Sequence, residues 1–228
     1  MPNITLSTEQ QLRKLMKIFL DENTRINLSA FRTEESCWAG NILDSLSALG
    51  IFPQPATSNS KLSLLDLGTG GGFPLLPLAI SLPNIRFTGL DSTQKKMDAV
   101  RRIAKQMDLT NVELIAGRAE VLGHEKKFRE QFNVVTARAV AEINVLLEYC
   151  SPLVKPGGKI VLWKSLNAGE ELKASEKAQR EFRCPFKESV VYELPGDFGK
   201  RQLLIFEKIG KLSEEYPRSV GTPKKNPV

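Results

Sequence analysis

The sequence predicts an α/β protein with a Rossmann-like, doubly wound sheet of seven mostly parallel strands, the last one antiparallel, and an N-terminal helical appendage. Three observations predict this fold class. From residue 61 onward, short β-rich runs alternate with helical patterns, as in a parallel sheet covered by helices on both faces. The first strand enters a helical pattern through a glycine-rich turn. Only a short break separates the last two strands, which should therefore pair antiparallel.

The N-terminal part of the chain carries helical patterns only. Ser7 and Gln10 form a capping-box pattern. An apolar face follows and predicts a helix over 7–22, formed by Leu12, Leu15, Met16, Phe19 and Leu20. A second helix, ending near Gly50, is predicted by Trp38, Ile42, Leu46 and Leu49. Turn and linker residues fill 53–61. We therefore expect a helical appendage over 1–60, a main domain over 61–210 and a basic tail over 211–228.

Seven β-rich runs are expected to build the sheet of the main domain. They are Leu62–Leu67, Ile85–Leu90, Val112–Ala116, Phe132–Thr136, Lys159–Trp163, Ser189–Leu194 and Gln202–Glu207. Between the second and third runs, Thr93–Met107 shows an amphipathic helical pattern. The break before the last run, residues 195–201, is too short for a crossover helix.

Composition indicates a protein without membrane spans, in a reducing cytoplasm. The chain is 41% hydrophobic and has no apolar run near the roughly 18 residues that a span needs. Its cysteines, Cys37, Cys150 and Cys184, have neither pairing nor metal-ligand spacing, so we expect free thiols and no metal. The net charge is +6, and residues 200–228 hold 7 basic and 3 acidic side chains. This basic end is either a phosphate-contacting arm or a solvated tail, and composition does not decide between them.

The strongest local signal is the segment LLDLGTGGGFPLLPLA, residues 64–79. Its alternate glycines, Gly68, Gly70 and Gly72, let the backbone approach a ligand closely where the strand ends. The nicotinamide fingerprint would need a third glycine at the position of Phe73, so that interpretation is disfavoured. Asp91 ends the next strand, where a carboxylate accepts hydrogen bonds from ribose hydroxyls, although it could merely cap the following helix. Together the two features predict an adenosylmethionine site.

Seven segments, in order, carry a resemblance to a known family. They are RINLSA (25–30), ILDSL (42–46), LGTGGGFPLLPLA (67–79), LDSTQKK (90–96), GRAE (117–120), TARAVAEINVLLEYCSPLVKPGGK (136–159) and YPRSVGTPKKNP (216–227). Over nearly its whole length the chain resembles the GidB/RsmG family of small-subunit (16S) rRNA guanine-N7 methyltransferases, which have the class I methyltransferase fold. It departs from the family pattern at Gly40-Asn41, where Arg-His is usual, and at Leu75, where glycine is usual.

The resemblance implies S-adenosyl-L-methionine as cofactor and 16S rRNA or the small ribosomal subunit as partner, methylated in the loop near the decoding centre. It implies cofactor contacts from Gly68, Phe73, Asp91, Ser92, Thr93, Ala119, Glu120 and Arg138. It places Arg118, Lys164 and Arg201 on the RNA-facing side. The tail charge and its family pattern add Arg218, Lys224 and Lys225 as candidate RNA contacts. We expect a monomer.

The acceptor atom is inferred from the catalytic motifs and reactive residues that the expected site lacks. The fourth strand tip reads Thr136-Ala137-Arg138, so the motif of exocyclic-amine methylases is missing. Cys184 lies away from the strand tips, and His124, the only histidine, lies in a charged loop. Guanine N7 has a lone pair and no proton, so a site without a general base suits it. Two alternatives remain open, namely a small-molecule methyltransferase and a noncatalytic RNA-binding module.

Overall fold

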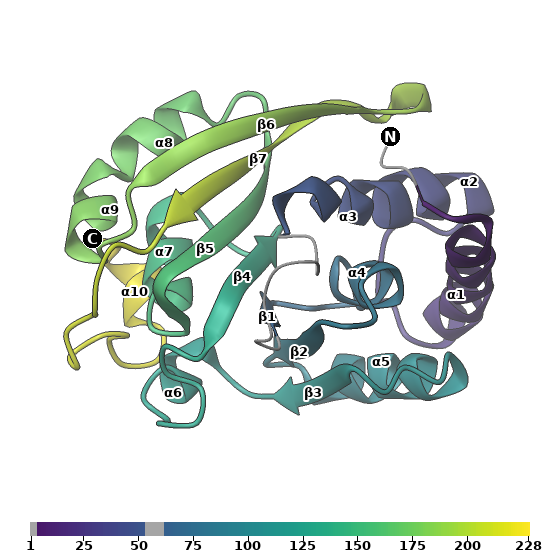
Figure 1. Cartoon of the computed structure of the whole chain (residues 1–228), viewed down its shortest axis with the longest axis horizontal. Coiled ribbons are helices and arrows are strands. Elements are labelled where there is room, and N and C mark those ends of the chain that lie inside the picture. The colour runs from purple at the N-terminus through teal and green to yellow at the C-terminus, as the bar shows by residue number, and fades with distance from the viewer. Residues whose placement is uncertain (1–3, 53–61) are drawn as a thin grey trace.

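The computed structural model describes residues 4–52 and 62–228 and has a single seven-stranded sheet at its centre (Figure 1). The spatial order of the strands is β3-β2-β1-β4-β5-β7-β6. Their bounds are β1 Ser63–Leu67, β2 Arg86–Asp91, β3 Val112–Ala116, β4 Phe132–Arg138, β5 Val154–Ser165, β6 Phe186–Leu194 and β7 Gly199–Glu207. The linker predicted at 53–61 lies outside the described residues.

The expected strand directions are confirmed. β1 to β5 pair parallel, whereas β7 pairs antiparallel with both β5 and β6. The last strand in sequence therefore lies inside the sheet, and β6 forms the edge (Figure 1). The connection between β6 and β7 is the short 3₁₀ turn Gly196–Phe198, as the short break predicts.

Helices cover both faces of the sheet. They are α1 Leu6–Arg25, α2 Glu34–Cys37, α3 Asp44–Leu46, α4 Leu75–Ser81, α5 Gln94–Gln106, α6 Ala119–Leu122, α7 Ile143–Cys150, α8 Gly169–Ala174, α9 Glu176–Glu181 and α10 Thr222–Lys225. Neighbouring residues on one strand enter different cores. Leu64 packs with the layer that holds α1, α4 and α5, and Leu65 packs with the layer that holds α6, α7 and α9. Both faces are buried, which explains the continuous apolar runs of these strands.

The N-terminal helices share the first of these cores with the sheet. Leu12, Leu15 and Phe19 are fully buried in the same cluster as Leu76. The Phe19 ring packs edge-on against Phe73, at 4.7 Å between centroids. The segment before residue 53 thus forms one face of the core that carries the glycine-rich turn.

The second predicted helix differs from the observed structure. It is divided into α2, a π-helical turn over Trp38–Leu43, and α3, followed by a 3₁₀ turn over Leu49–Ile51. Within the π-turn the carbonyl of Gly40 accepts a hydrogen bond from Arg138 of β4, 3.1 Å away. Such turns recur at functional sites, and hydrophobic spacing alone does not reveal this one.

Residues 211–228 are docked on the protein. The Arg129 guanidinium donates to the carbonyl oxygens of Leu212, Ser213 and Tyr216, at 2.7 to 3.3 Å. The buried carboxylate of Glu148 on α7 binds Arg218 through two side-chain hydrogen bonds of 2.8 and 2.6 Å. The segment therefore lies against α6 and α7 rather than extending from the surface (Figure 1). In the described part of the chain, no helix is long and apolar enough to cross a membrane.

Candidate active site

A cavity of about 530 Å³ opens at the carboxyl ends of β1, β2, β3 and β4. In this strand order the chain leaves β1 toward β2 and β3 and then returns to β4 on the other side of β1. Ligands of doubly wound folds bind where the strand order reverses in this way. The predicted cofactor residues Gly68, Gly70, Phe73, Asp91, Ser92, Thr93, Ala119, Glu120 and Arg138 all line this cavity, and Gly72 lies within the same turn.

The alternate glycines adopt left-handed backbone conformations but serve different needs. Their φ angles are +73° at Gly68, +54° at Gly70 and +94° at Gly72. A Cβ on Gly68 would lie 2.4 Å from Val140, and one on Gly72 would lie 2.7 Å from Leu76. A Cβ on Gly70 would have no protein atom closer than 3.6 Å. Packing therefore requires glycine at the outer two positions, whereas Gly70 borders open space in the cavity.

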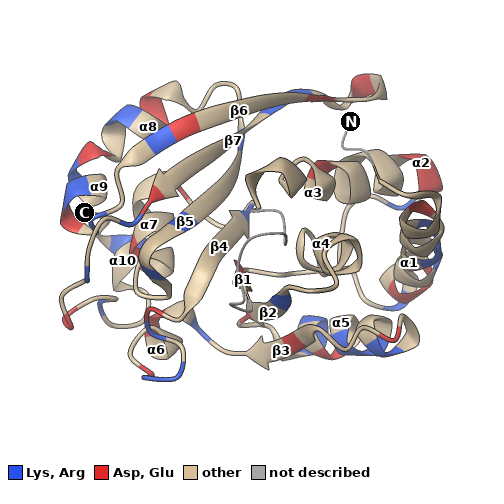
Figure 2. Ribbon diagram, viewed as in Figure 1, with Lys and Arg blue, Asp and Glu red and all other residues tan. Residues whose placement is uncertain are grey.

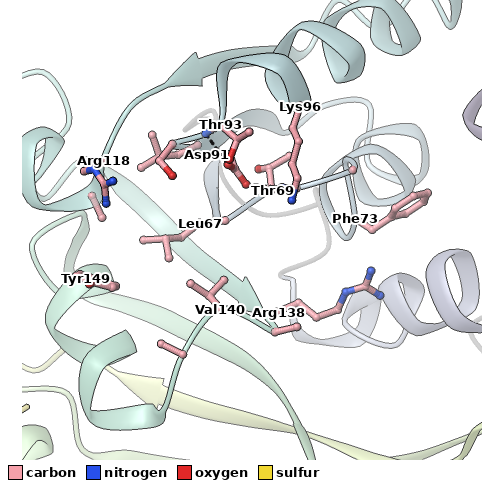
Figure 3. A pocket seen from close by; sticks show the side chains of 18 of the residues that line it. Leu67, Thr69, Phe73, Asp91, Thr93, Lys96, Arg118, Arg138, Val140 and Tyr149 are labelled. Atoms are coloured by element: carbon pink, nitrogen blue, oxygen red, sulfur yellow. Dashed lines mark hydrogen bonds between the residues drawn. The ribbon is translucent and has the colours of Figure 1, made fainter. Parts of the chain in front are cut away.

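Asp91 connects the glycine-rich turn to Thr93, the N-cap residue of α5. One carboxylate oxygen accepts the backbone N–H of Gly70 at 2.9 Å, and the other accepts that of Thr93 at 2.8 Å (Figure 3). These two contacts give Asp91 a structural role, and its binding of ribose hydroxyls stays a prediction. Each carboxylate oxygen has a second lone pair, and the side chain lies on the wall of the cavity, so it can still accept from ligand hydroxyls.

Asp66 lies buried beneath the glycine-rich turn. Its Oδ1 accepts a hydrogen bond from the Thr136 hydroxyl at 2.8 Å, and its Oδ2 has no partner within the described structure. Burial raises the pKa of the Asp66 carboxyl to about 7, against the opposing effect of the Thr136 hydrogen bond. A group that titrates near neutrality thus lies directly under the cavity floor.

The third strand tip forms one end of the cavity. Arg118 and Tyr149 lie there, on the side away from Phe73 and Arg138 (Figure 3). Glu120 also lines the cavity. The buried Glu120 carboxylate accepts the backbone N–H of Gly221 at 3.1 Å. Burial and the neighbouring Glu120 raise the pKa of Tyr149 to about 12. The docked C-terminal segment thus completes this end, and its Lys224 also lines the cavity.

The fourth strand tip forms the opposite end, around Arg138. Its guanidinium donates to Asp44 Oδ2 at 2.7 Å and to Asn41 Oδ1 at 3.1 Å. The guanidinium carbon lies 6.0 Å from the centroid of the Phe73 ring. Sequence reasoning missed several lining residues, namely Leu28, Ser29, Asn41, Lys96, Val140 and Tyr149. Among them, Asn41 belongs to the departure from the family pattern.

The predicted RNA contacts fall into two groups. Arg118 and Lys224 line the cavity, and Lys225 is exposed beside Lys224 on α10. The other three side chains lie near carboxylates of the protein. Lys164 lies 2.5 Å from Glu171, Arg201 lies 3.5 Å from Asp44, and Arg218 lies 2.6 Å from Glu148. The structure therefore brings only part of the predicted set to the mouth of the cavity.

Other reactive side chains lie away from the cavity. His124 binds the carbonyl oxygen of Pro217 at 2.7 Å. Cys184 is fully buried, and burial raises the pKa of its thiol to about 12. Among residues 4–52 and 62–228, no group of three or more His, Cys, Asp or Glu side chains could hold a metal ion.

Comparison with solved structures agrees with the fold. Solved methyltransferases share the fold at low identity. M. jannaschii TYW2 in complex with AdoMet has a TM-score of 0.56 at 16% identity, over 75% of this chain and 77% of that one. The O-methyltransferase from Bacillus cereus in complex with SAH has a TM-score of 0.56 at 19% identity, over 86% and 91%.

Sequence comparison is more specific. The ribosomal RNA small subunit methyltransferase G of Carboxydothermus hydrogenoformans is 39% identical over 219 residues, which cover 96% of this chain and 91% of that protein. The protein of the same name from Leuconostoc mesenteroides is 37% identical over 99% of this chain and 94% of its own length. The family model GidB, described as rRNA small subunit methyltransferase G, matches residues 8–200. The chain therefore belongs to the GidB family of rRNA small subunit methyltransferases G.

Proposed function

We propose that this chain transfers a methyl group from S-adenosyl-L-methionine to N7 of a specific guanine in 16S rRNA of the small ribosomal subunit. The observation that carries the proposal is the cavity at the carboxyl ends of β1 to β4, whose lining includes the carboxylates of Asp91 and Glu120. Backbone N–H groups hold both carboxylates in place. Curated relatives named for small-subunit rRNA methylation support the substrate class. The position of the guanine in the loop near the decoding centre rests on the family resemblance alone.

The residues of the cavity fit S-adenosylmethionine, the cofactor of this methyltransferase family. Gly70 leaves space where a side chain would stand, so the backbone can pass close to the ligand. Asp91 offers carboxylate lone pairs for the ribose hydroxyls, and Ala119 and Glu120 lie where the adenine ring would bind. Arg138, at the opposite end, supplies a cation for the methionine carboxylate. When bound, the sulfonium supplies an electrophilic methyl group.

The chain's own residues then have to position the acceptor and exclude water. The acceptor base would enter beside the fourth strand tip, where Arg138 and Val140 line the cavity. Guanine N7 needs no residue to remove a proton, because its lone pair is free in the neutral base. We therefore assign positioning to these residues and a general base to none of them.

The reaction is tested with labelled S-adenosylmethionine and small subunits from cells that lack the protein. We expect label in 16S rRNA and strand scission at the new methyl group after borohydride and aniline, because methylation at N7 leaves a positive purine ring. If the RNA resisted scission at every newly labelled guanine, the methylated atom would instead be the exocyclic amine or a ribose hydroxyl. Label in small molecules but not in rRNA would favour a small-molecule methyltransferase. The absence of any methyl transfer would favour a noncatalytic RNA-binding module.

The single-turnover rate should also be nearly flat between about pH 6 and 9, where a general base would change the rate tenfold per pH unit below its pKa. The buried carboxyl of Asp66 requires a control, because burial raises its pKa to about 7. An inflection that disappears in Asp66→Asn comes from this carboxyl beneath the turn. An inflection of the pH–rate curve that persists in Asp66→Asn would indicate that a general base takes part, which contradicts the proposed mechanism.

We also propose that rRNA phosphates meet the exposed cations at the mouth of the cavity, chiefly Arg118, Lys224 and Lys225. Lys224 and Lys225 lie on α10 at one side of the cavity, and Arg118 lies at the third strand tip on the same side. Lys164, Arg201 and Arg218 form ion pairs with carboxylates of the protein. We therefore assign them a structural role beside the RNA-binding surface. A monomeric enzyme in the cytoplasm, where ribosomal subunits assemble, completes the proposal.

Replacing Lys224 and Lys225 together by alanine should weaken rRNA binding more than cofactor binding. If both meet phosphates, the slope of log affinity against log salt should fall by up to about 2 units. Fluorescence titration at several salt concentrations measures this slope. The matched control replaces Lys14 and Lys17, exposed on α1 at the far side of the molecule (Figure 2). Equal slopes for the two double variants would remove α10 from the RNA surface.

A further inference from the structure

A carboxylate outside the cavity collects hydrogen bonds from three strands at once. Asp44, the first residue of α3, is 0% exposed. Its side chain accepts from Arg138 of β4 at 2.7 Å and from the Tyr192 hydroxyl of β6 at 2.6 Å. Arg201 of β7 lies 3.5 Å away. The Asp44 carbonyl oxygen also accepts from the indole of Trp163 on β5, at 2.9 Å.

Such a cluster is a costly way to stabilise a fold. Removing a carboxylate from water carries a large desolvation penalty, and apolar packing of equal volume is often as stable or more so. The cluster does, however, leave the Arg138 guanidinium little freedom of orientation, because its partners come from fixed elements. The terminal nitrogens of Arg138 bind the Gly40 carbonyl, Asn41 Oδ1 and Asp44 Oδ2.

Arg138 is also the part of this cluster that reaches the cavity. It lines the cavity together with Asn41, whereas Asp44, Tyr192 and Arg201 lie behind them. The Asn41 amide is itself held, since its Nδ2 donates to the Ser29 hydroxyl at 3.3 Å. Gly40 is required at its place, because a Cβ there would lie 2.5 Å from Phe31 and 2.7 Å from Phe198. Both residues of the departure from the family pattern, Gly40 and Asn41, therefore contact the Arg138 guanidinium.

We propose that Asp44 is a positioning residue that sets the orientation of Arg138 toward the cofactor, with Asn41 as its second support. This deepens the proposed function, since it assumes that the cavity binds S-adenosylmethionine. Asp44 touches neither cofactor nor substrate. It acts by holding the guanidinium on its outer side, and through Tyr192 and Arg201 it ties the β6–β7 hairpin to the cofactor site.

The test is cofactor binding measured by calorimetry without RNA, which stays readable even if the rRNA is not the substrate. Asp44→Asn keeps the shape of the side chain but removes its charge. We expect S-adenosylmethionine affinity to fall about tenfold in this variant, because a charged hydrogen bond to the arginine is lost. In the Arg138→Gln background the same substitution should have almost no further effect, since the group that it positions is gone.

Tyr192→Phe is the matched control, because it removes a donor to the same carboxylate on the hairpin side and leaves Arg138 untouched. Its cofactor affinity should stay within about twofold of the unaltered protein. If Asp44→Asn does not fold, Asn41→Ala replaces it in the test. Its effect on S-adenosylmethionine affinity is then compared with and without Arg138→Gln. Two results would overturn the proposal. One is unchanged affinity in a folded Asp44→Asn protein, and the other is an equal loss in both arginine backgrounds, which would indicate a general structural effect.

Discussion

Gly70→Val should lower the affinity for S-adenosylmethionine by about 100-fold or more, because the side chain would fill space that the ligand needs. The Cβ of this residue would meet no protein atom closer than 3.6 Å, so the first side-chain atom has room in the protein without ligand. The strain of a β-branched residue at φ +54° adds a cost of about 1–2 kcal/mol to folding. The fold should survive this cost. Calorimetric titration measures the affinity, and circular dichroism confirms the fold.

The controls separate ligand space from backbone strain. Gly70→Asn carries a residue that tolerates left-handed backbone better than valine does, so its remaining loss of affinity reports side-chain bulk. Gly68→Val should mainly destabilise the protein instead, because its Cβ would lie 2.4 Å from Val140. A folded Gly70→Val protein with normal cofactor affinity would remove this turn from the binding site.

Arg218→Ala should lower the free energy of unfolding by about 3 kcal/mol, because it leaves a buried carboxylate without its partner. Glu148 is 1% exposed, and Arg218 supplies three hydrogen bonds to it, two from the guanidinium and one from the backbone. Only the backbone bond would remain in the variant. Urea unfolding at neutral pH measures the change, and the exposed neighbour Lys225→Ala should stay within about 0.5 kcal/mol.

Adding Glu148→Gln to Arg218→Ala should restore part of the lost stability, because a neutral amide is less costly to bury than an unpaired charge. This recovery distinguishes a charge effect from lost packing. If Arg218→Ala unfolded at the same urea concentration as the unaltered protein, the docking of the C-terminal segment would not depend on this pair.

Local sequence patterns predicted the features that depend on neighbours along the chain. The alternation of apolar runs, the glycines at 68, 70 and 72 and the carboxylate at 91 lie within single strands and turns, so their spacing is visible directly. The predicted helix over 93–107 is observed as Gln94–Gln106 with caps at both ends. The direction of β7 followed from the length of one connection.

The rest depends on contacts between distant segments. Asp44 binds Arg138 across 94 positions of sequence, and Arg201 across 157. The partners of an aspartate in an apolar helical segment cannot be inferred from its local sequence. For the same reason, the family resemblance placed Lys164 on the RNA-facing side and the tail pattern suggested Arg218 as an RNA contact, while the carboxylates that they meet could be seen only in the folded chain.

The hydrogen bond between Gly221 and Glu120 has a consequence for the order in which the enzyme becomes competent during synthesis. The glycine-rich turn and the first four strand tips are complete once the ribosome has made β5, but the wall that contains Lys224 is made some 60 residues later. Until then the carboxylates of Glu120 and Glu148 lack their C-terminal partners. A nascent chain that has not reached residue 221 therefore lacks the partner of Glu120 at the third strand tip, and this end of the cavity closes only after residue 221 has been made.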